Sequence, residues 1–111
     1  MSYQIKSKIW IEHNSQTYLG EGRIRLMQQI IKLGSISAAA KSMKMSYKKA
    51  WEMIDSINKS SKKPLVIKVT GGKGGGGTQV TAEGIKTIAI FENLNKKCQQ
   101  FLDKEIAKIN L

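Results

Sequence analysis

The chain has 111 residues, which is room for one domain but not for a nucleotide-binding domain joined to a substrate domain. Its hydrophobic fraction of 41% excludes a disordered chain, and its net charge of +11 points to a polyanionic partner. The positive charge is concentrated, because residues 41–73 hold nine lysines against Glu52 and Asp55. A well-solvated, lysine-rich surface is the alternative explanation.

Residue types that carry chemistry are sparse. His13 is the only histidine and Cys98 the only cysteine, so we expect no disulfide, no metal-ligand cluster and a reducing compartment. The same scarcity argues against an enzyme. The longest unbroken apolar run, Ile88 to Phe91, is far shorter than the ~20 residues that span a bilayer, and the start lacks an apolar signal segment. We therefore expect a cytoplasmic protein without a membrane segment.

The N-terminal residues 1–19 have the pattern of strands. Ile5, Ile9 and Ile11 alternate with polar residues over positions 5–12, which is the period of a half-buried strand. The sequence "HNSQ" then indicates a turn, and Thr17 to Leu19 a short return strand. The sequence predicts a small hairpin or arm here.

A helix is predicted over residues 21–33 and a second over 35–42. Ile24, Met27, Ile30 and Ile31 recur at three- and four-residue steps, as on one helix face, and Gly34 has the place of a C-cap. The second helix has either Ser35 or Ser37 as its N-cap and carries three alanines, which allow close helix packing.

A third helix is predicted over residues 46–58, with Ser46 as its N-cap. Ala50, Ile54 and Ile57 should face the core, and the first turn is polar, aromatic and cationic. Two helices joined by such a short turn have the helix-turn-helix layout. Trp51 has two interpretations at this stage: it closes the edge of the core, or it lies against a bound nucleic acid.

Residues 64–81 contain two short β-branched runs, "LVIKV" and "TQVT", on either side of the loop "TGGKGGGG". This pattern predicts a glycine-tipped hairpin. The G-x-G-x-x-G spacing of Gly72, Gly74 and Gly77 also matches a dinucleotide fingerprint, but that site needs a helix directly after the glycines. A strand follows here, so we reject a nucleotide site.

The last predicted helix covers residues 82–108, with Thr81 as its N-cap. Phe91, Leu94, Cys98 and Phe101 recur along it at the spacing of a helix–helix seam. The seam packs either on its own domain or on a second subunit; beyond about Asn95 we favour the second subunit. The predicted fold is therefore one mainly α domain with a small β wing, a winged helix-turn-helix with an N-terminal hairpin or arm and a long C-terminal helix.

Three segments go beyond this order of elements: "GSISAAAKSMKMSYKKAWEMIDSIN" (34–58), "TGGKGGGGTQVTAEG" (70–84) and "GEGRIRLMQQI" (20–30). Together they resemble the N-terminal, LysR-like DNA-binding domain of the bacterial ModE-type molybdenum-dependent transcriptional regulators. The resemblance implies a sequence-specific DNA-binding protein that dimerises on partly palindromic operators. In that family a second, C-terminal module binds molybdate or tungstate. The chain stops at Leu111, where that module would begin, so we expect no cofactor in this chain and leave open an effector that binds elsewhere or through a partner.

The site residues follow from this hypothesis. Lys48 or Lys49 could donate to guanine or contact phosphate, and Lys73 would place one cation on the backbone or minor groove. The expected DNA-binding residues are Ser35, Ser46, Tyr47, Lys48, Lys49, Glu52, Lys73, Gly74, Gly75 and Thr78. The expected dimer interface is Phe91, Leu94, Cys98, Phe101 and Leu102. The alternatives are a non-specific architectural DNA- or RNA-binding protein and a protein-interaction module; operator, target genes and sign of regulation are not predicted.

Overall fold

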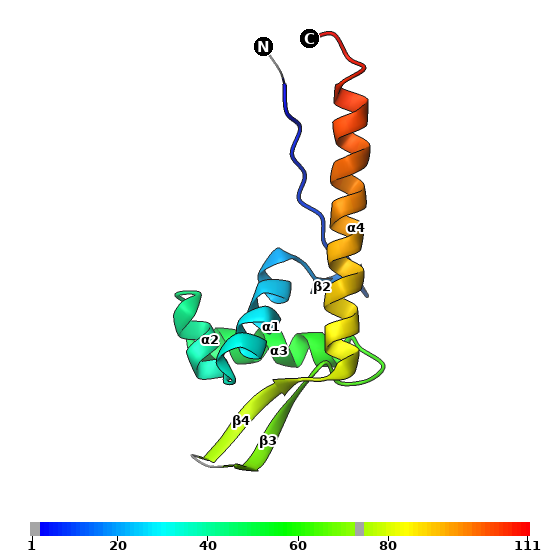
Figure 1. The fold of residues 1–111 in the computed structure, drawn as a ribbon. Helices are drawn as coiled ribbons and strands as arrows, with labels where there is room; N and C mark the ends of the chain where they lie inside the picture. The colour runs from blue at the N-terminus through cyan, green and yellow to red at the C-terminus, as the bar shows by residue number, and fades with distance from the viewer. Residues whose placement is uncertain (1–2, 73–74) are drawn as a thin grey trace.

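The computed structural model describes residues 3–72 and 75–111 and has the predicted winged helix-turn-helix fold. Three helices and a β-hairpin gather at one end of a long fourth helix, whose other end projects past them (Figure 1). The molecule is accordingly elongated, with extents of 60 × 29 × 22 Å. Among the described residues, no helix combines the length and apolar character needed to cross a membrane. In chain order the elements are β1 (Ile11–His13), β2 (Gln16–Leu19), α1 (Glu21–Leu33), α2 (Ile36–Ser42), α3 (Tyr47–Lys59), β3 (Val66–Gly72), β4 (Gly75–Val80) and α4 (Ala82–Ile106).

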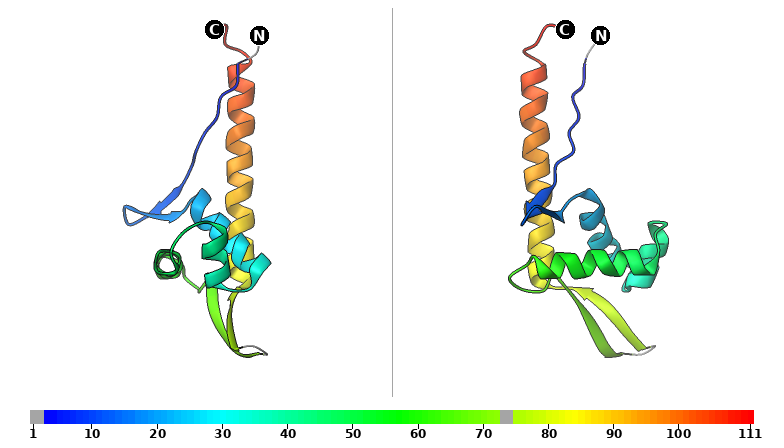
Figure 2. Two further views of the ribbon diagram at one scale, coloured as in Figure 1. Left: turned by 90° about the vertical axis from the view of Figure 1, so that its left-hand side faces the viewer. Right: turned by 180° about the vertical axis from the view of Figure 1, so that it is seen from behind.

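The N-terminal hairpin is shorter than predicted. β1 and β2 pair antiparallel, and Asn14 and Ser15 form the turn at φ values of 52° and 63°, as a two-residue hairpin turn requires. Of the strand predicted over residues 5–12, only Ile11 and Glu12 are in β1; the prediction is wrong for residues 5–10, because β2 has only four residues and leaves the earlier positions without a strand to pair with. Residues 3–10, here called the arm, instead run beside α4 (Figures 1 and 2). The Gln99 amide holds the arm by donating to the carbonyl oxygen of Ile5 at 2.7 Å.

The helix ends follow the capping residues in the sequence. Ser35, not Ser37, caps α2 by accepting from the Ala38 N–H, and Ser46 caps α3 by accepting from Lys49 at 3.0 Å. Thr81 caps α4 through the N–H of Gly84 at 3.0 Å. α4 ends at Ile106, two residues before its predicted end, and α3 continues one residue further, to Lys59.

The core lies where α1, α2, α3, the base of the wing and the first half of α4 meet. Ala50, Ile54 and Ile57 face it from α3, as predicted. On α1 the prediction for Ile31 is wrong, since its side chain is 53% exposed while Leu26 is fully buried. Ile31 lies one residue past the buried stripe, about 100° around the helix from Ile30. The core residues are Leu19, Ile24, Leu26, Met27, Ile30, Ile36, Ala39, Ala40, Ala50, Ile54, Ile57, Leu65, Val66, Val80, Ile88 and Phe91.

Candidate nucleic-acid interface

A tight turn sets α3 across α2. The N–H of Met45 reaches back to the carbonyl of Ala40 at 3.0 Å, so the chain reverses within residues 43–46. Lys44 adopts φ 56° in this turn, a left-handed conformation that a lysine rarely takes. The buried alanines Ala39 and Ala40 allow the close approach of the two helices.

The first turn of α3 is open to solvent. Ser46, Tyr47, Lys48 and Lys49 are all exposed, whereas the next residue, Ala50, is fully buried. Because successive residues advance by about 100°, Lys48 and Glu52 lie opposite the core stripe. The outward face of α3 therefore presents a cation and a carboxylate at adjacent turns.

The two flanks of α3 differ. Lys49 lies on the flank of Met53 and Ser56, which faces α1, where the guanidinium of Arg23 approaches the Ser56 hydroxyl at 3.5 Å. Burial lowers the pKa of Arg23 below its usual value. The opposite flank carries Tyr47 and Trp51 and faces the wing. Trp51 is 40% exposed and is not among the buried core residues, but it lines a cavity together with the core residue Ile54.

Hydrogen bonds between described residues fix the wing, β3 and β4, to α3 and to the turn between α1 and α2. The side-chain oxygen of Asn58 accepts from the N–H groups of Leu65 and Val66, and its amide donates to the Val66 carbonyl at 2.9 Å. In β4 the N–H of Thr78 donates to the carbonyl of Gly34, in the turn between α1 and α2, at 3.1 Å. These bonds set the angle between the wing and α3.

A groove runs between α3 and the wing. Two adjoining cavities of about 300 and 210 Å³ form it and share Ile36, Lys68 and Thr78 in their linings. Tyr47 stands at one cavity and Trp51 at the other, both on the α3 side. Lys68 was not predicted as a site residue, because a lysine within a strand is usually no more than part of a solvated face. Its placement opposite two aromatic rings depends on the tertiary fold.

The structure describes only some of the remaining predicted DNA-binding residues, which are Ser35 and four residues of the wing. Lys73 and Gly74 lie outside the described residues, and Gly75 begins β4. Thr78 and Ser35 are half-buried, and each forms a hydrogen bond within the fold. The Thr78 N–H donates to the Gly34 carbonyl, and the Ser35 hydroxyl accepts from the Ala38 N–H. The hydroxyl of Ser37, which was not predicted as a site residue, also borders the groove.

The residues of the predicted dimer seam on α4 range from buried in the core to exposed at the surface. Phe91 is 4% exposed and belongs to the core of its own domain. Leu94 and Phe101 are 44% and 63% exposed, and Ile90, which the sequence analysis did not include, is 50% exposed on the same face. Cys98 and Leu102 are half-buried. The exposed stripe thus begins one residue earlier than the predicted seam.

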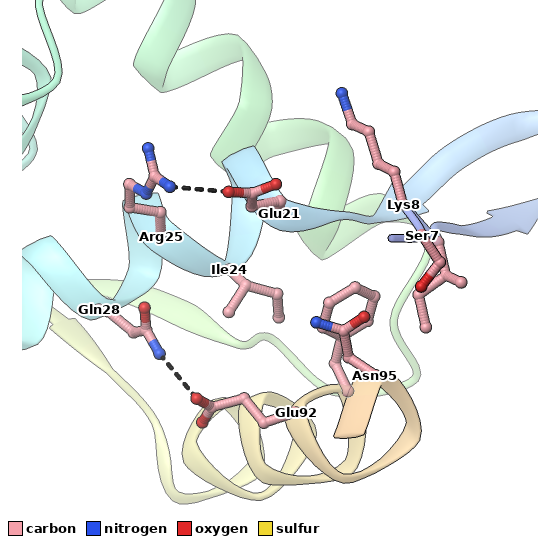
Figure 3. Close-up of a pocket in the computed structure, with 10 residues that line it drawn as sticks. Ser7, Lys8, Glu21, Ile24, Arg25, Gln28, Glu92 and Asn95 are labelled. Atoms are coloured by element: carbon pink, nitrogen blue, oxygen red, sulfur yellow. Dashed lines mark hydrogen bonds and ion pairs between the residues drawn. The ribbon is translucent and has the colours of Figure 1, made fainter. Parts of the chain in front are cut away.

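A further pocket of about 200 Å³ lies between the arm, α1 and α4, away from α3 (Figure 3). Gln28 of α1 donates to Glu92 of α4 at 3.4 Å, and Arg25 pairs with Glu21 at 2.8 Å, while the Lys8 ammonium points away from the cavity. The four charged side chains have both signs, which gives the pocket no preference for an anion. In the part of the chain that the structure describes, no histidine, cysteine or carboxylate cluster could hold a metal ion.

Comparison with known families identifies this arrangement. Residues 22–85 match the bacterial regulatory helix-turn-helix proteins of the lysR family. The chain belongs to this family. The matched range includes α1, α2, α3 and the wing, and therefore both walls of the groove.

The resemblance to ModE-type regulators is confirmed as well. The chain is 43% identical over 94 residues to the molybdenum transport protein ModE of Azotobacter vinelandii, covering 85% of this chain and 35% of the relative. It is 42% identical over 81 residues to the DNA-binding transcriptional dual regulator ModE of Escherichia coli K12, covering 73% and 31%. It is also 36% identical over 93 residues to the molybdenum-pterin-binding protein MopB of Rhodobacter capsulatus, covering 84% and 34%. The chain thus matches about a third of the length of these relatives.

Proposed function

We propose that this protein is a transcriptional regulator, not an enzyme, and that it binds operator DNA sequence-specifically with α3 in the major groove and the wing on the backbone or minor groove. The observation that carries the proposal is the open first turn of α3, with Lys48 and Glu52 pointing away from the core in a lysR-family chain. The net charge of +11 supports a polyanionic partner. Such a role belongs in the bacterial cytoplasm.

The positions on α3 suggest different tasks for its residues. Lys48 projects outward and is suited to donate to guanine O6 and N7, while Glu52, one turn later, could accept from cytosine N4. Lys49 lies on the flank toward α1, which suits a phosphate contact that fixes position without selecting bases. Lys73 keeps its proposed role as a phosphate or minor-groove contact.

We also propose that the protein acts as a homodimer through α4. Ile90, Leu94 and Phe101 form an exposed apolar stripe along one face of α4. Apolar residues at this spacing pack well against a second helix. Two recognition helices about 34 Å apart would then contact half-sites one DNA turn apart.

Selection from a random duplex pool tests the function. The protein should enrich a partly palindromic sequence, and log K for the selected duplex should fall with log salt at a slope of about −0.9 per phosphate neutralised. Enrichment of no sequence, with the same salt dependence, would indicate a non-specific architectural protein. Preference for RNA over duplex DNA of the same sequence would equally contradict the proposal.

The names of two relatives refer to molybdenum, but we propose that these 111 residues bind no oxyanion themselves. Titration calorimetry with molybdate should give no binding heat, and molybdate should leave DNA affinity unchanged. A saturable heat with one site per chain would contradict this part of the proposal.

A further inference from the structure

We propose that the groove between α3 and the wing holds the DNA strand that separates the major from the minor groove, with Lys68 at a phosphate and Trp51 against a deoxyribose. The inference rests on the proposed function and adds two contact residues, neither of which belongs to the first turn of α3 or to the glycine loop.

The geometry of DNA requires a strand at this place. The major and minor grooves are separated by a ridge of sugar and phosphate. If α3 lies in one groove and the wing reaches the next, that ridge passes between the two elements. The structure has an opening there, since the cavities of about 300 and 210 Å³ adjoin along Ile36, Lys68 and Thr78.

The lining of the groove suits a sugar–phosphate strand. Lys68 is exposed, and among the described residues it forms no ion pair; the nearby carboxylate of Asp55 pairs instead with Lys59 at 2.8 Å. Lys68 therefore offers an uncompensated cation to a phosphate. Ser37 and Thr78 line the groove too, and their hydroxyls provide neutral donors.

The α3 side of the groove carries two aromatic side chains that suit the sugars of a DNA strand. Tyr47 and Trp51 are 51% and 40% exposed, although rings of this size are usually buried more deeply. They lie one helical turn apart on the same flank of α3, and each lines a cavity that Lys68 also lines. A deoxyribose ring presents a matching apolar face next to its phosphate.

The groove is preformed, because both of its walls are fixed. Asn58 ties the end of α3 to the start of β3, and the bond from Thr78 to Gly34 ties β4 to the turn between α1 and α2. DNA binding would therefore lose no conformational entropy in ordering α3 and the wing base. Contacts to a strand's backbone should strengthen binding to every sequence equally.

A cycle of protein and DNA changes tests the inference. Single phosphates across the selected half-site are replaced, one at a time, by neutral methylphosphonates, and affinities are measured for the wild type, Lys68→Ala and Lys104→Ala. Lys104 is an exposed lysine near the end of α4 and is the matched control. Lys68→Ala should weaken binding about tenfold, the size of one charge-assisted contact, and lower the salt slope by roughly one unit.

The decisive result is the coupling. At one backbone position the methylphosphonate should weaken the wild type but leave Lys68→Ala unchanged, whereas Lys104→Ala should behave as the wild type at every position. Trp51→Ala should weaken operator and scrambled duplex by the same factor, and Trp51→Phe should restore part of the loss while keeping the fold. The groove inference is wrong if the losses of affinity caused by Lys68→Ala and by each methylphosphonate simply add. The proposed function stands in that case, provided that the wild type still prefers the operator. If the wild type has no preferred duplex, the proposed function itself fails.

Discussion

The backbone N–H of Thr78 donates to the carbonyl oxygen of Gly34 at 3.1 Å, and this one bond attaches the wing to the turn between α1 and α2. Gly34 is itself held in place at the end of α1. It adopts a φ of 81°, and its N–H donates to the carbonyl oxygen of Ile30 at 2.8 Å. A side chain on Gly77 would place its Cβ 3.1 Å from the same carbonyl oxygen. The position of the wing therefore depends on the absence of a side chain at residue 77.

Gly77→Ala should displace the wing. Since the Gly34 carbonyl belongs to a capped turn and cannot easily move, the strand must shift, and we expect a loss of ~1 kcal/mol of unfolding free energy together with weaker DNA binding. Urea unfolding and a duplex titration measure the two effects. Gly22→Ala is the control, because its Cβ would meet nothing closer than a methionine methyl at 3.9 Å. Equal stability and DNA affinity in Gly77→Ala and the wild type would contradict the argument.

Asn58→Ala should destabilise the protein by about 1–3 kcal/mol, because the half-buried backbone groups of Leu65 and Val66 lose their partner. The midpoint of urea unfolding measures this. Asn95→Ala on the exposed surface of α4 should change stability by less than about 0.5 kcal/mol. Similar midpoints for the two variants would show that Asn58 does not hold the wing.

Lys44→Gly should stabilise the protein. Lysine at φ 56° carries a strain of roughly 1–2 kcal/mol, part of which is offset by the greater freedom of glycine in the unfolded chain, so we expect a net gain of about 0.5–1 kcal/mol. Lys41→Gly, the same change inside α2, should instead cost ~1 kcal/mol. Thermal unfolding of both variants measures the difference. A lower melting temperature for Lys44→Gly would mean that the Lys44 side chain stabilises the turn.

Phe101→Lys should turn a dimer into a monomer, because it places a charge at the most exposed residue of the apolar stripe on α4. Ile85→Lys is the control: Ile85 is 54% exposed on the opposite face of the same helix and should leave the dimer intact. Sedimentation equilibrium measures the mass of each. If the wild type is a monomer at high micromolar concentration, the proposal of a dimer through α4 is wrong.

Local sequence signals predicted most of the fold. Ser46 and Thr81 cap their helices because a side-chain oxygen needs no tertiary partner to bind the first free N–H groups. The strand predicted over residues 5–12 formed only at its end, because strand formation depends on a partner strand and the four residues of β2 are too few to pair with residues 5–10. Alternation of Ile5 and Ile9 alone could not show that the partner would be α4.

The sequence predicted those parts of the candidate site that depend on one helix alone. The outward position of Lys48 follows from the helical period alone. Lys68 and the exposure of Trp51 could not be predicted, because both depend on the angle between α3 and the wing. That angle is set by Asn58 and by the bond between Thr78 and Gly34, contacts between segments that the sequence does not place side by side.

If α3 contacts bases, Lys48→Ala should change the sequence specificity of DNA binding. Wild type, Lys48→Ala and the Lys104→Ala control are titrated against the selected duplex and its single-base variants at one fixed salt concentration. We expect Lys48→Ala to lose ~1–3 kcal/mol of discrimination at one guanine of each half-site and to keep it elsewhere, while Lys104→Ala matches the wild type. If Lys48→Ala binds every duplex more weakly by one common factor, Lys48 contacts only phosphate and α3 does not read the operator through it.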